Sequence, residues 1–334
     1  MKKYLFIILL IISSNLSSFK NFKNGEFKNN EPTALFTDEM SIWDFFKTEL
    51  NRVPIKEIIP LNVDVESFVK DNIEQIKMYL QIDCPSTGCD DWDRFANVKV
   101  KDPSTGNWYE IARYITPYWV GTQQLARGLE FDVTDFKSLL SGSVELRIYI
   151  ENWTQKADIV SIDFDYIVGT PDYQNYAVSE IFNLHSNSIS GIPYGVSHNI
   201  DLNKSIQIPS EAEEIEFRTI ISGWGHATPY DSDGRPCAEW CFRSHNIKIN
   251  NTQAFEHYMG PIGCASNPVS NQNPGNWQPD RAGWCPGMQV PVRTNNLDLS
   301  FGGSTISYEY ELEDWTSDGN GGDAYYAIST YIIL

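Results

Sequence analysis

The sequence predicts an all-β protein, with an antiparallel sandwich or barrel in each half of the chain. Three observations support this prediction. Apolar and polar residues alternate with period two in many short segments, turn-forming residues separate these segments, and the second half contains no helical pattern of ordinary length. The 334 residues suffice for two domains, each with a sizeable hydrophobic core.

The alternation is clearest in residues 76–82, where the apolar side chains at every second position face one side of a strand. In residues 144–151 the apolar positions share one face, and Glu151 lies on the other, so it is expected to point away from the core. Residues 134–142 resemble a capped helical turn. Further strands are expected at residues 97–101, 108–114, 129–133, 160–168, 215–221, 245–249, 308–312 and 325–334.

The N-terminus has the pattern of a secretory signal peptide. Lys2 and Lys3 precede an apolar run that is too short to span a bilayer, and small residues follow this run. We therefore expect the protein to be secreted or periplasmic. A turn-rich break at residues 169–172 marks the expected domain boundary. The expected division is a signal peptide at 1–18, a tether at 19–33, an N-terminal domain at 34–170 and a C-terminal domain at 174–334.

The charge balance argues against some classes of partner. The chain has 25 basic and 44 acidic side chains. Nucleic acids and anionic membranes bind basic surfaces, so neither is expected as a partner. No further apolar stretch is long enough to cross a membrane. We expect a soluble protein that acts as a monomer.

The six cysteines are expected to form disulfides. All of them follow the signal segment, and an even number of cysteines in an oxidising compartment favours disulfides. Six cysteines allow fifteen pairings. The alternative is a zinc site, but the first two neighbouring pairs lack the usual two-residue gap between zinc ligands. Proximity in the sequence favours the pairs Cys84–Cys89, Cys237–Cys241 and Cys264–Cys285.

Two cysteine-bounded segments each carry an acid beside a tryptophan. The segment 84–94 places Asp93 after a cysteine-bounded Pro/Gly turn, and the segment 237–243 places Glu239 inside the loop. Glu151 ends a predicted strand. Carboxylates held in fixed orientations suit general acid–base catalysis of a hydrolysis, and carboxylates held close together push their pKa values apart. For any one of these acids alone, a surface salt bridge is the commoner interpretation.

Aromatic residues around these acids favour a carbohydrate substrate. Sugar rings present C–H faces that stack on aromatic rings, and their hydroxyl groups bond to carboxylates, amides and arginine. Each aromatic residue taken alone is more often part of a core than a binding platform. The candidate substrate-binding residues are Trp92, Trp153, Trp224, Trp240, Trp284, Tyr118, Trp119 and Arg281.

Other kinds of active site find little support in the sequence. The motif Gly-x-Ser-x-Gly is absent, so a serine nucleophile on a strand-to-helix turn is not indicated. The five histidines form no closely spaced pair, and no phosphate-binding glycine motif occurs. His226 is interpreted as a hydrogen-bonding loop residue at the substrate site rather than a metal ligand. We expect no metal and no cofactor.

Eight segments resemble the bacterial peptide-N-glycosidase F family, in order from about residue 34 to the end of the chain: residues 89–94, 108–111, 114–121, 132–142, 169–173, 221–227, 237–243 and 279–287. The resemblance implies two antiparallel jelly-roll sandwiches packed side by side, with the site between them. It also implies hydrolysis, without a metal, of the amide that joins an N-glycan to asparagine in N-glycosylated proteins and glycopeptides. The match is imperfect at Phe95 and on both sides of Glu151.

The resemblance also implies roles for individual residues. The catalytic acids of the family fall on Asp93, Glu239 and Glu151, and its disulfides coincide with the pairs favoured by proximity. Residues that contact glycan or peptide in the family correspond to Arg94, Arg281, Trp153, Trp224, Trp240 and Trp284.

Three other functions stay open from the residues alone. An endo-acting glycoside hydrolase also uses two carboxylates, but it would leave one sugar on the peptide. A non-catalytic glycan-binding module would release no product. A copper monooxygenase with paired sandwiches is a weaker analogy, because the required histidine pairs are missing.

Overall fold

The computed structural model describes residues 7–9, 27–28, 34–35, 70–173, 177–185 and 191–334. Most of the predicted signal peptide and tether therefore lies outside the described residues. In the part of the chain that is described, no helix has the length and apolar character needed to cross a membrane. The chain divides into two compact units, and each takes in parts of the chain that are not contiguous. Unit 1 consists of Met1–Asp91, Ala96–Ala112 and Trp119–Ala177, and unit 2 of Trp92–Phe95, Arg113–Tyr118 and Val178–Leu334.

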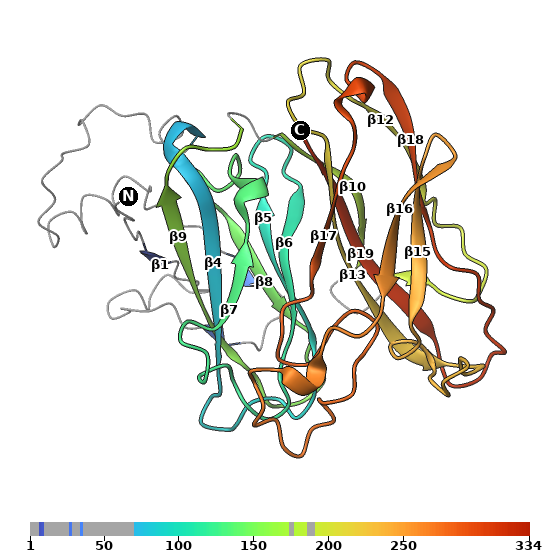
Figure 1. Ribbon diagram of the computed structural model, residues 1–334. Coiled ribbons are helices and arrows are strands. Elements are labelled where there is room, and N and C mark those ends of the chain that lie inside the picture. The colour runs from blue at the N-terminus through green and yellow to red at the C-terminus, as the bar shows by residue number, and fades with distance from the viewer. Residues whose placement is uncertain (1–6, 10–26, 29–33, 36–69, 174–176, 186–190) are drawn as a thin grey trace, which may run out of the picture. The chain divides into compact units, whose positions relative to one another are not determined.

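Unit 1 contains two antiparallel sheets, with strand orders β1-β9-β4-β7 and β3-β8-β5-β6, and β2 also pairs with β9 (Figure 1). The last residues of β6 and the first residue of β5 belong to unit 2. The strands are β1 (Ile7–Leu9), β2 (Phe27–Lys28), β3 (Ala34–Leu35), β4 (Ile73–Asp83), β5 (Phe95–Lys101), β6 (Trp108–Ile115), β7 (Leu129–Asp132), β8 (Leu146–Ile150) and β9 (Ile159–Val168).

The alternating pattern of β4 produces the core of unit 1. Ile76, Met78, Leu80 and Ile82 are all fully buried, as the period-two pattern predicts. The intervening positions carry polar residues, among them Lys77, which pairs with a glutamate of β7. The predicted helical turn after β7 is a short 3₁₀ helix at Thr134–Phe136, where Phe136 is buried.

Unit 2 also contains two antiparallel sheets. The first has the order β10-β19-β13-β14, with β11 beside β19 and β17 beside β13, and the second has the order β12-β18-β15-β16. Their bounds are β10 (Val178–Leu184), β11 (Ile192–Pro193), β12 (Asn203–Gln207), β13 (Glu216–Ala227), β14 (Cys237–Ala238), β15 (Arg243–Ile249), β16 (Thr252–Met259), β17 (Val292–Asn296), β18 (Thr305–Glu311) and β19 (Ala324–Ile333).

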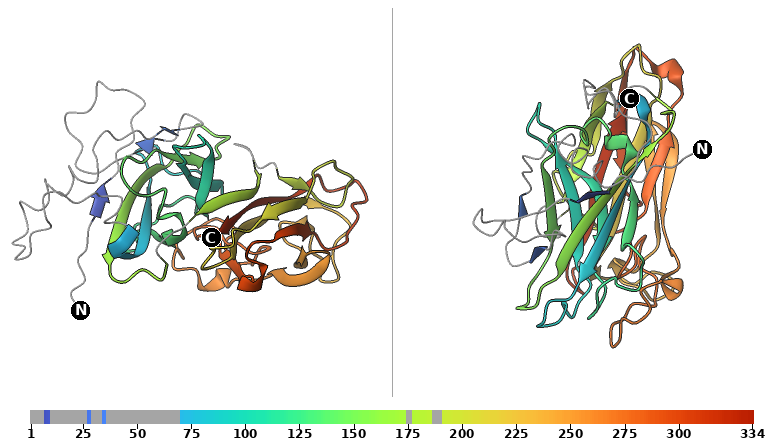
Figure 2. Two further views of the ribbon diagram at one scale, coloured as in Figure 1. Left: turned by 90° about the horizontal axis from the view of Figure 1, so that it is seen from above. Right: turned by 90° about the vertical axis from the view of Figure 1, so that its left-hand side faces the viewer.

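The long strands β13 and β19 form the centre of unit 2 and lie side by side in every view (Figures 1 and 2). Their pairing is continuous from Glu216 opposite Ile333 to Gly225 opposite Ala324. Both strands are buried over most of their length, so neither shows a strict alternation of buried and exposed positions. At its C-terminal end β13 carries Trp224 and His226, which places both at one end of this sheet.

Strand alternation did not predict β10, β12, β16 or β17. Strand β12 has the sequence NKSIQ and β17 the sequence VRTNN, and neither strand has a fully buried residue. Strands β10, β12 and β16 stand at the ends of their sheet orders. Pairing through the backbone to one neighbour holds such strands, and this leaves little signal in the side chains.

Two buried histidines face each other across β15 and β16. His245 and His257 occupy opposed positions of the strand pair and are 0% and 3% exposed. The His245 Nδ1 atom accepts a hydrogen bond from the backbone of Glu313, and His257 lies within hydrogen-bond distance of the Tyr310 hydroxyl and the Asn295 side chain. Burial lowers the pKa of His245 to about 3 and that of His257 to about 4.

Replacing both histidines by glutamine is expected to weaken the acid sensitivity of the fold. Below its ordinary pKa a histidine binds a proton in the unfolded chain, whereas His245 and His257 stay neutral in the folded unit. The free energy of unfolding is therefore not reduced by these histidines above pH ~6.5. It falls as the pH drops, by about 2 kcal/mol per histidine between pH 7 and pH 5.

Urea unfolding at pH 7 and pH 5 measures this difference. The double variant should lose less free energy of unfolding between the two pH values than the unchanged protein, whatever its stability at pH 7. His198→Gln, at an exposed position, is the control and should retain the full pH dependence. An unchanged pH dependence in the double variant would contradict the prediction.

Candidate active site

Backbone hydrogen bonds join three segments of unit 2 at the end of β13. His226 pairs with Ala238 of the short strand β14. The Glu239 N–H donates to the carbonyl of Gly225 at 3.1 Å, and the carbonyl of Glu239 accepts from the Ala282 N–H at 2.7 Å. Glu239 and the segment that follows Arg281 are thus fixed to each other through the main chain.

Asp93 is fixed by a different set of hydrogen bonds. The Thr116 hydroxyl accepts from the backbone N–H of Arg94 at 2.9 Å and donates to the carbonyl of Trp92 at 3.2 Å. The Thr116 N–H also donates to the carbonyl of Arg94 at 3.0 Å. Because these bonds hold both residues that flank Asp93, the aspartate has a defined position beside the segment that leads to Tyr118.

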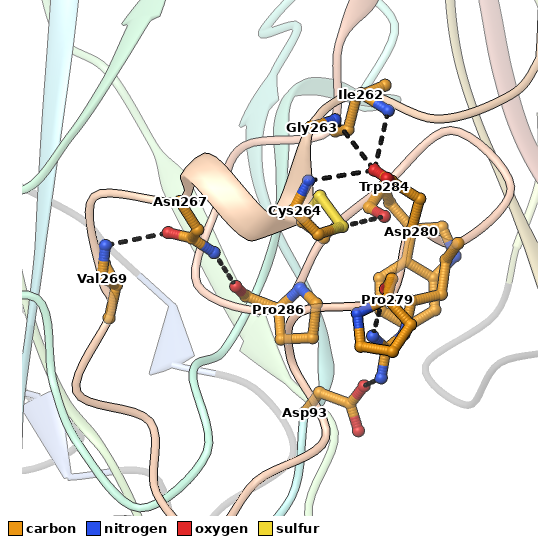
Figure 3. Close-up of a disulfide and its surroundings, with 12 residues drawn as sticks. Asp93, Ile262, Gly263, Cys264, Asn267, Val269, Pro279, Asp280, Trp284 and Pro286 are labelled. Carbon is orange, nitrogen blue, oxygen red and sulfur yellow. Dashed lines mark hydrogen bonds and ion pairs between the residues drawn. A yellow bond between two sulfur atoms is a disulfide. The ribbon is translucent and has the colours of Figure 1, made fainter.

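Arg281 lies between two carboxylates. Its Nη2 atom is 3.6 Å from Asp93 Oδ2, and its Nε atom is 3.7 Å from Glu239 Oε1. The Arg281 side chain is 1% exposed, and the two acids are 13% and 15% exposed. The ion pair with Asp93 is drawn as a dashed line in Figure 3. Charges buried to this extent interact far more strongly than they would at a surface.

The remaining donors of Arg281 are directed at the protein itself. Its guanidinium donates to the carbonyls of Pro279 and Asn276, at 2.7 and 2.5 Å, and to the Tyr118 hydroxyl at 3.2 Å. The Tyr118 hydroxyl is in turn hydrogen-bonded to the carboxylate of Asp93. Arg281, Tyr118 and Asp93 therefore form one connected polar cluster.

Aromatic rings enclose this cluster within unit 2. The Arg281 guanidinium lies over the ring of Trp240 at 4.3 Å and over that of Trp284 at 5.4 Å. The ring of Trp284 stacks on Trp224 at 4.5 Å, and its indole N–H donates to the carbonyl of Gly223. Trp224 and Trp284 are 6% and 1% exposed, so they support the arginine rather than present an open face.

The long loop after β16 is held by a disulfide and a carboxylate. Cys264 and Cys285 are joined, and the Asp280 side chain accepts hydrogen bonds from three successive backbone N–H groups, those of Ile262, Gly263 and Cys264 (Figure 3). This acid immediately precedes Arg281. The bonds that restrain Asp280 therefore restrain the position from which the arginine side chain starts.

The electrostatic surroundings set the protonation of the acids. Burial and the negative charge of Glu239 raise the pKa of the Asp93 carboxyl to about 7, against the attraction of the Arg281 guanidinium. A buried carboxyl beside a second carboxylate is expected to resist ionisation in this way. Burial and the charge of Asp93 also raise the pKa of the Tyr118 phenol, which stays protonated at neutral pH. A hydrogen bond with Glu239, 3.1 Å away, raises the pKa of His226.

All three predicted disulfides are present: Cys84–Cys89, Cys237–Cys241 and Cys264–Cys285. None of the six cysteines is left as a thiol. Among the described residues, one group has the spacing of metal ligands, namely Cys264, Asp280 and Cys285. Because the two sulfur atoms are bonded to each other and Asp280 accepts three N–H groups, this group has a structural role.

The other predicted site residues lie outside this cluster. Glu151 belongs to unit 1 and is 2% exposed, although strand alternation placed it on the face away from the core. Trp119 and Trp153 also belong to unit 1 and are 39% and 73% exposed. Trp92 of unit 2 is 57% exposed, whereas Arg94, two residues further on, is 3% exposed.

Two residues that organise the cluster were not among the predicted ones. Thr116 holds the segment around Asp93, and the fully buried Gln272 accepts a hydrogen bond from the Tyr118 N–H. Gln272 lies in a loop rich in Gly, Pro and Asn, where polar residues are normally exposed. No pattern in the sequence distinguishes a buried glutamine there from an exposed one.

Comparison with known proteins identifies the family. Models of the N-terminal and C-terminal domains of peptide-N-glycosidase F match residues 99–166 and 193–333. Peptide-N(4)-(N-acetyl-beta-D-glucosaminyl)asparagine amidase F of Elizabethkingia miricola is 57% identical over 261 residues, which cover 78% of this chain and 74% of that protein. The chain belongs to the peptide-N-glycosidase F family.

Solved structures agree with this assignment. PNGase F, described as a glycosylasparaginase from Flavobacterium meningosepticum, aligns with a TM-score of 0.81 and 49% identity, over 94% of this chain and 93% of that one. A second structure of the amidase gives a TM-score of 0.80 with 49% identity and 94% coverage of both chains. PNGF-II, at 15% identity and a TM-score of 0.62 over 99% of this chain and 64% of that one, shares the fold. The predicted all-β class with two antiparallel jelly-roll domains is confirmed.

Proposed function

We propose that this chain is a secreted or periplasmic amidase that removes N-glycans from glycoproteins and glycopeptides. It hydrolyses the amide bond between the innermost N-acetylglucosamine and the asparagine side chain. Water adds to the amide carbonyl, the bond from carbon to nitrogen breaks, and the side chain becomes aspartate while the glycan leaves as a glycosylamine. The membership of the peptide-N-glycosidase F family supports this function.

The observation that carries the proposal is the pair of buried carboxylates on one arginine. Asp93 and Glu239 approach the same guanidinium, at 3.6 and 3.7 Å. A carboxylate with a pKa near 7 is a stronger base than an ordinary aspartate and is still ionised in a useful fraction at neutral pH. We assign to Asp93 the removal of the proton from the attacking water, and to Glu239 the orientation of that water.

Arg281 favours the ionised form of the buried Asp93 carboxyl. Without its positive charge, Asp93 would hold its proton to a higher pH. Since its donors reach Pro279, Asn276 and Tyr118, its role is to stabilise the acids rather than to bind sugar. Glu151 retains its predicted role, which is to position the sugar or the leaving nitrogen, as a hypothesis that rests on the family resemblance.

Mass spectrometry of a defined N-glycopeptide after incubation with the purified protein tests the function. The expected product is a peptide in which the glycosylated asparagine has become aspartate and no sugar remains. In heavy-oxygen water, one solvent oxygen should enter the new carboxyl group, because the proposed step adds water to the amide carbonyl.

The other functions would give different products. An endo-acting glycoside hydrolase would leave one N-acetylglucosamine on an unchanged asparagine, and a glycan-binding module would leave the glycopeptide intact. Either result would overturn the amidase assignment. A Glu151→Gln variant in the same assay tests the third acid, whose loss should lower turnover without changing the identity of the product.

A further inference from the structure

We propose that Tyr118 is a positioning residue whose hydroxyl group holds the Asp93 carboxylate against Arg281, and that Gln272 holds Tyr118 in place. This inference rests on the proposed amidase function for its kinetic consequences. It differs from the sequence-based interpretation, in which Tyr118 is an aromatic platform for the substrate.

The Tyr118 ring has no open face that could serve as a platform. The residue is 7% exposed. The backbone of Gly275 lies so close to the ring that an added Cβ atom there would be 2.3 Å from Tyr118 Cγ. A sugar could not stack on that side, because stacking requires the whole ring face to be free. The absence of a side chain at Gly275 is what allows this approach.

The hydroxyl group of Tyr118 connects the two charged groups. It accepts a hydrogen bond from Arg281 Nη2 at 3.2 Å and is hydrogen-bonded to the Asp93 carboxylate. A phenol has one proton to donate, and here the carboxylate is its acceptor. Since one oxygen atom bonds to both partners, its removal would release Asp93 and Arg281 from this shared contact together.

The main chain of Tyr118 is fixed by a residue distant in sequence. The Tyr118 N–H donates to Gln272 Oε1 at 3.0 Å. The Gln272 amide nitrogen donates to the carbonyls of Val269 and Pro286, at 2.7 and 3.0 Å. Gln272 is fully buried, and both of its amide protons and its oxygen are engaged. It therefore ties Tyr118 to both sides of the disulfide-closed loop that carries Arg281.

The groups around Asp93 determine how the loss of the Tyr118 hydroxyl group would change the pKa of this carboxyl. Asp93 faces Arg281 and Tyr118, which stabilise its ionised form, and Glu239, which opposes it. His226 pairs with Glu239 at 3.1 Å, and the charge of Asp93 contributes to the raised pKa of this histidine. Removing one hydrogen bond to the carboxylate favours its protonated form, so the pH at which Asp93 ionises should rise.

Tyr118→Phe tests the proposal, because it removes the hydroxyl group and keeps the ring against Gly275. With a defined N-glycopeptide, kcat should fall about tenfold while KM changes less than about twofold. The acidic limb of the pH profile of kcat/KM should move up by about one pH unit. If Tyr118 were a substrate platform, the retained ring would leave kcat and KM nearly unchanged, and if its role were only structural, kcat would fall without a shift of the acidic limb. Either result would overturn the proposal.

A second measurement does not depend on activity. NMR titration of isotope-labelled aspartate carboxyl groups, with Asp93 assigned by its loss in Asp93→Asn, should show the Asp93 pKa higher by about one unit in Tyr118→Phe. Gln272→Met should shift it in the same direction by less. An unmoved Asp93 titration would refute the role of Tyr118, whereas an unchanged glycopeptide with the original protein would refute only the amidase function.

Tyr166→Phe provides the matched control. Tyr166 is 5% exposed and its hydroxyl donates to the carbonyl of Leu140 at 2.6 Å, so the same substitution removes a buried hydrogen bond elsewhere. Any loss of stability should resemble that of Tyr118→Phe. The kinetic pH profile and the Asp93 titration should stay as they are in the unchanged protein.

Discussion

Asp93→Asn is expected to lower kcat by at least about a thousandfold, while the protein becomes no less stable. The amide cannot take a proton from water, so the general-base contribution is lost entirely. The oxygen of asparagine can still accept the hydrogen bond of Tyr118, which keeps the local packing. The measurement is the initial rate of deglycosylation of a defined glycopeptide, with circular dichroism to confirm the fold.

The raised pKa of Asp93 explains why Asp93→Asn should not lower the free energy of unfolding. Its pKa of about 7 in the folded protein exceeds the ordinary value of 3.8. The ionised side chain therefore disfavours the folded state, and this cost appears as the pH rises through the interval between the two values. Asp93→Asn removes the cost, so urea unfolding at pH ~8 should show equal or greater stability.

Asp91→Asn is the matched control, since Asp91 lies two residues away and pairs with Lys156 on the part-exposed side of unit 1. It should leave the rate within about twofold, because exposed ion pairs contribute little. The assignment of Asp93 as the base would be wrong if Asp93→Asn kept more than a tenth of the activity.

Arg281→Met is expected to damage both activity and stability. The variant leaves Asp93 and Glu239 buried close to each other without the cation between them, and it also leaves the carbonyls of Pro279 and Asn276 without their donor. Breaking a buried ion pair by removing one partner costs about 3–5 kcal/mol. The rate should fall about a hundredfold or more, with the acidic limb of the pH profile moved upward because the pKa of Asp93 rises.

Two further variants separate charge from geometry. Arg281→Lys restores the charge but not the planar set of donors, so its rate and stability should fall between those of the original protein and Arg281→Met. Arg235→Met removes an arginine that pairs with Asp231 and Asp233 on a turn, and it should cost less than about 1 kcal/mol. Equal losses in the two methionine variants would show that Arg281 has no special relation to the acids.

The sequence carries information about strands whose two faces differ. Strand β4 follows the predicted alternation residue by residue, and its apolar side chains are fully buried. Strands β12 and β17 have no fully buried residue, and backbone pairing together with polar side-chain contacts holds them to their neighbours, so they leave no alternating apolar pattern. An alternating sequence arises where one face of a strand packs against a core, and β12 and β17 have little contact with a core.

Asp93 and Glu239 were predicted as site residues because cysteine pairs mark their segments in the sequence. Asp93 follows one short cysteine-bounded loop and Glu239 lies inside another, and both cysteine pairs form disulfides. No comparable sequence feature distinguishes Gln272. Its partner Tyr118 is 154 positions away, and a hydrogen bond over that distance depends on the complete fold. Whether Glu151 acts with the other two acids is a question that the variant Glu151→Gln addresses.

The composition of unit 2 limits how this enzyme could be divided or recombined. Two short stretches of the first part of the chain, Trp92–Phe95 and Arg113–Tyr118, belong to this unit. A gene fragment that starts after residue 174 would encode Glu239 and Arg281 but neither Asp93 nor Tyr118. A chimera that exchanged only the C-terminal half would therefore take part of this polar cluster from each parent. To keep the cluster from one parent, the exchange would have to include both short stretches as well.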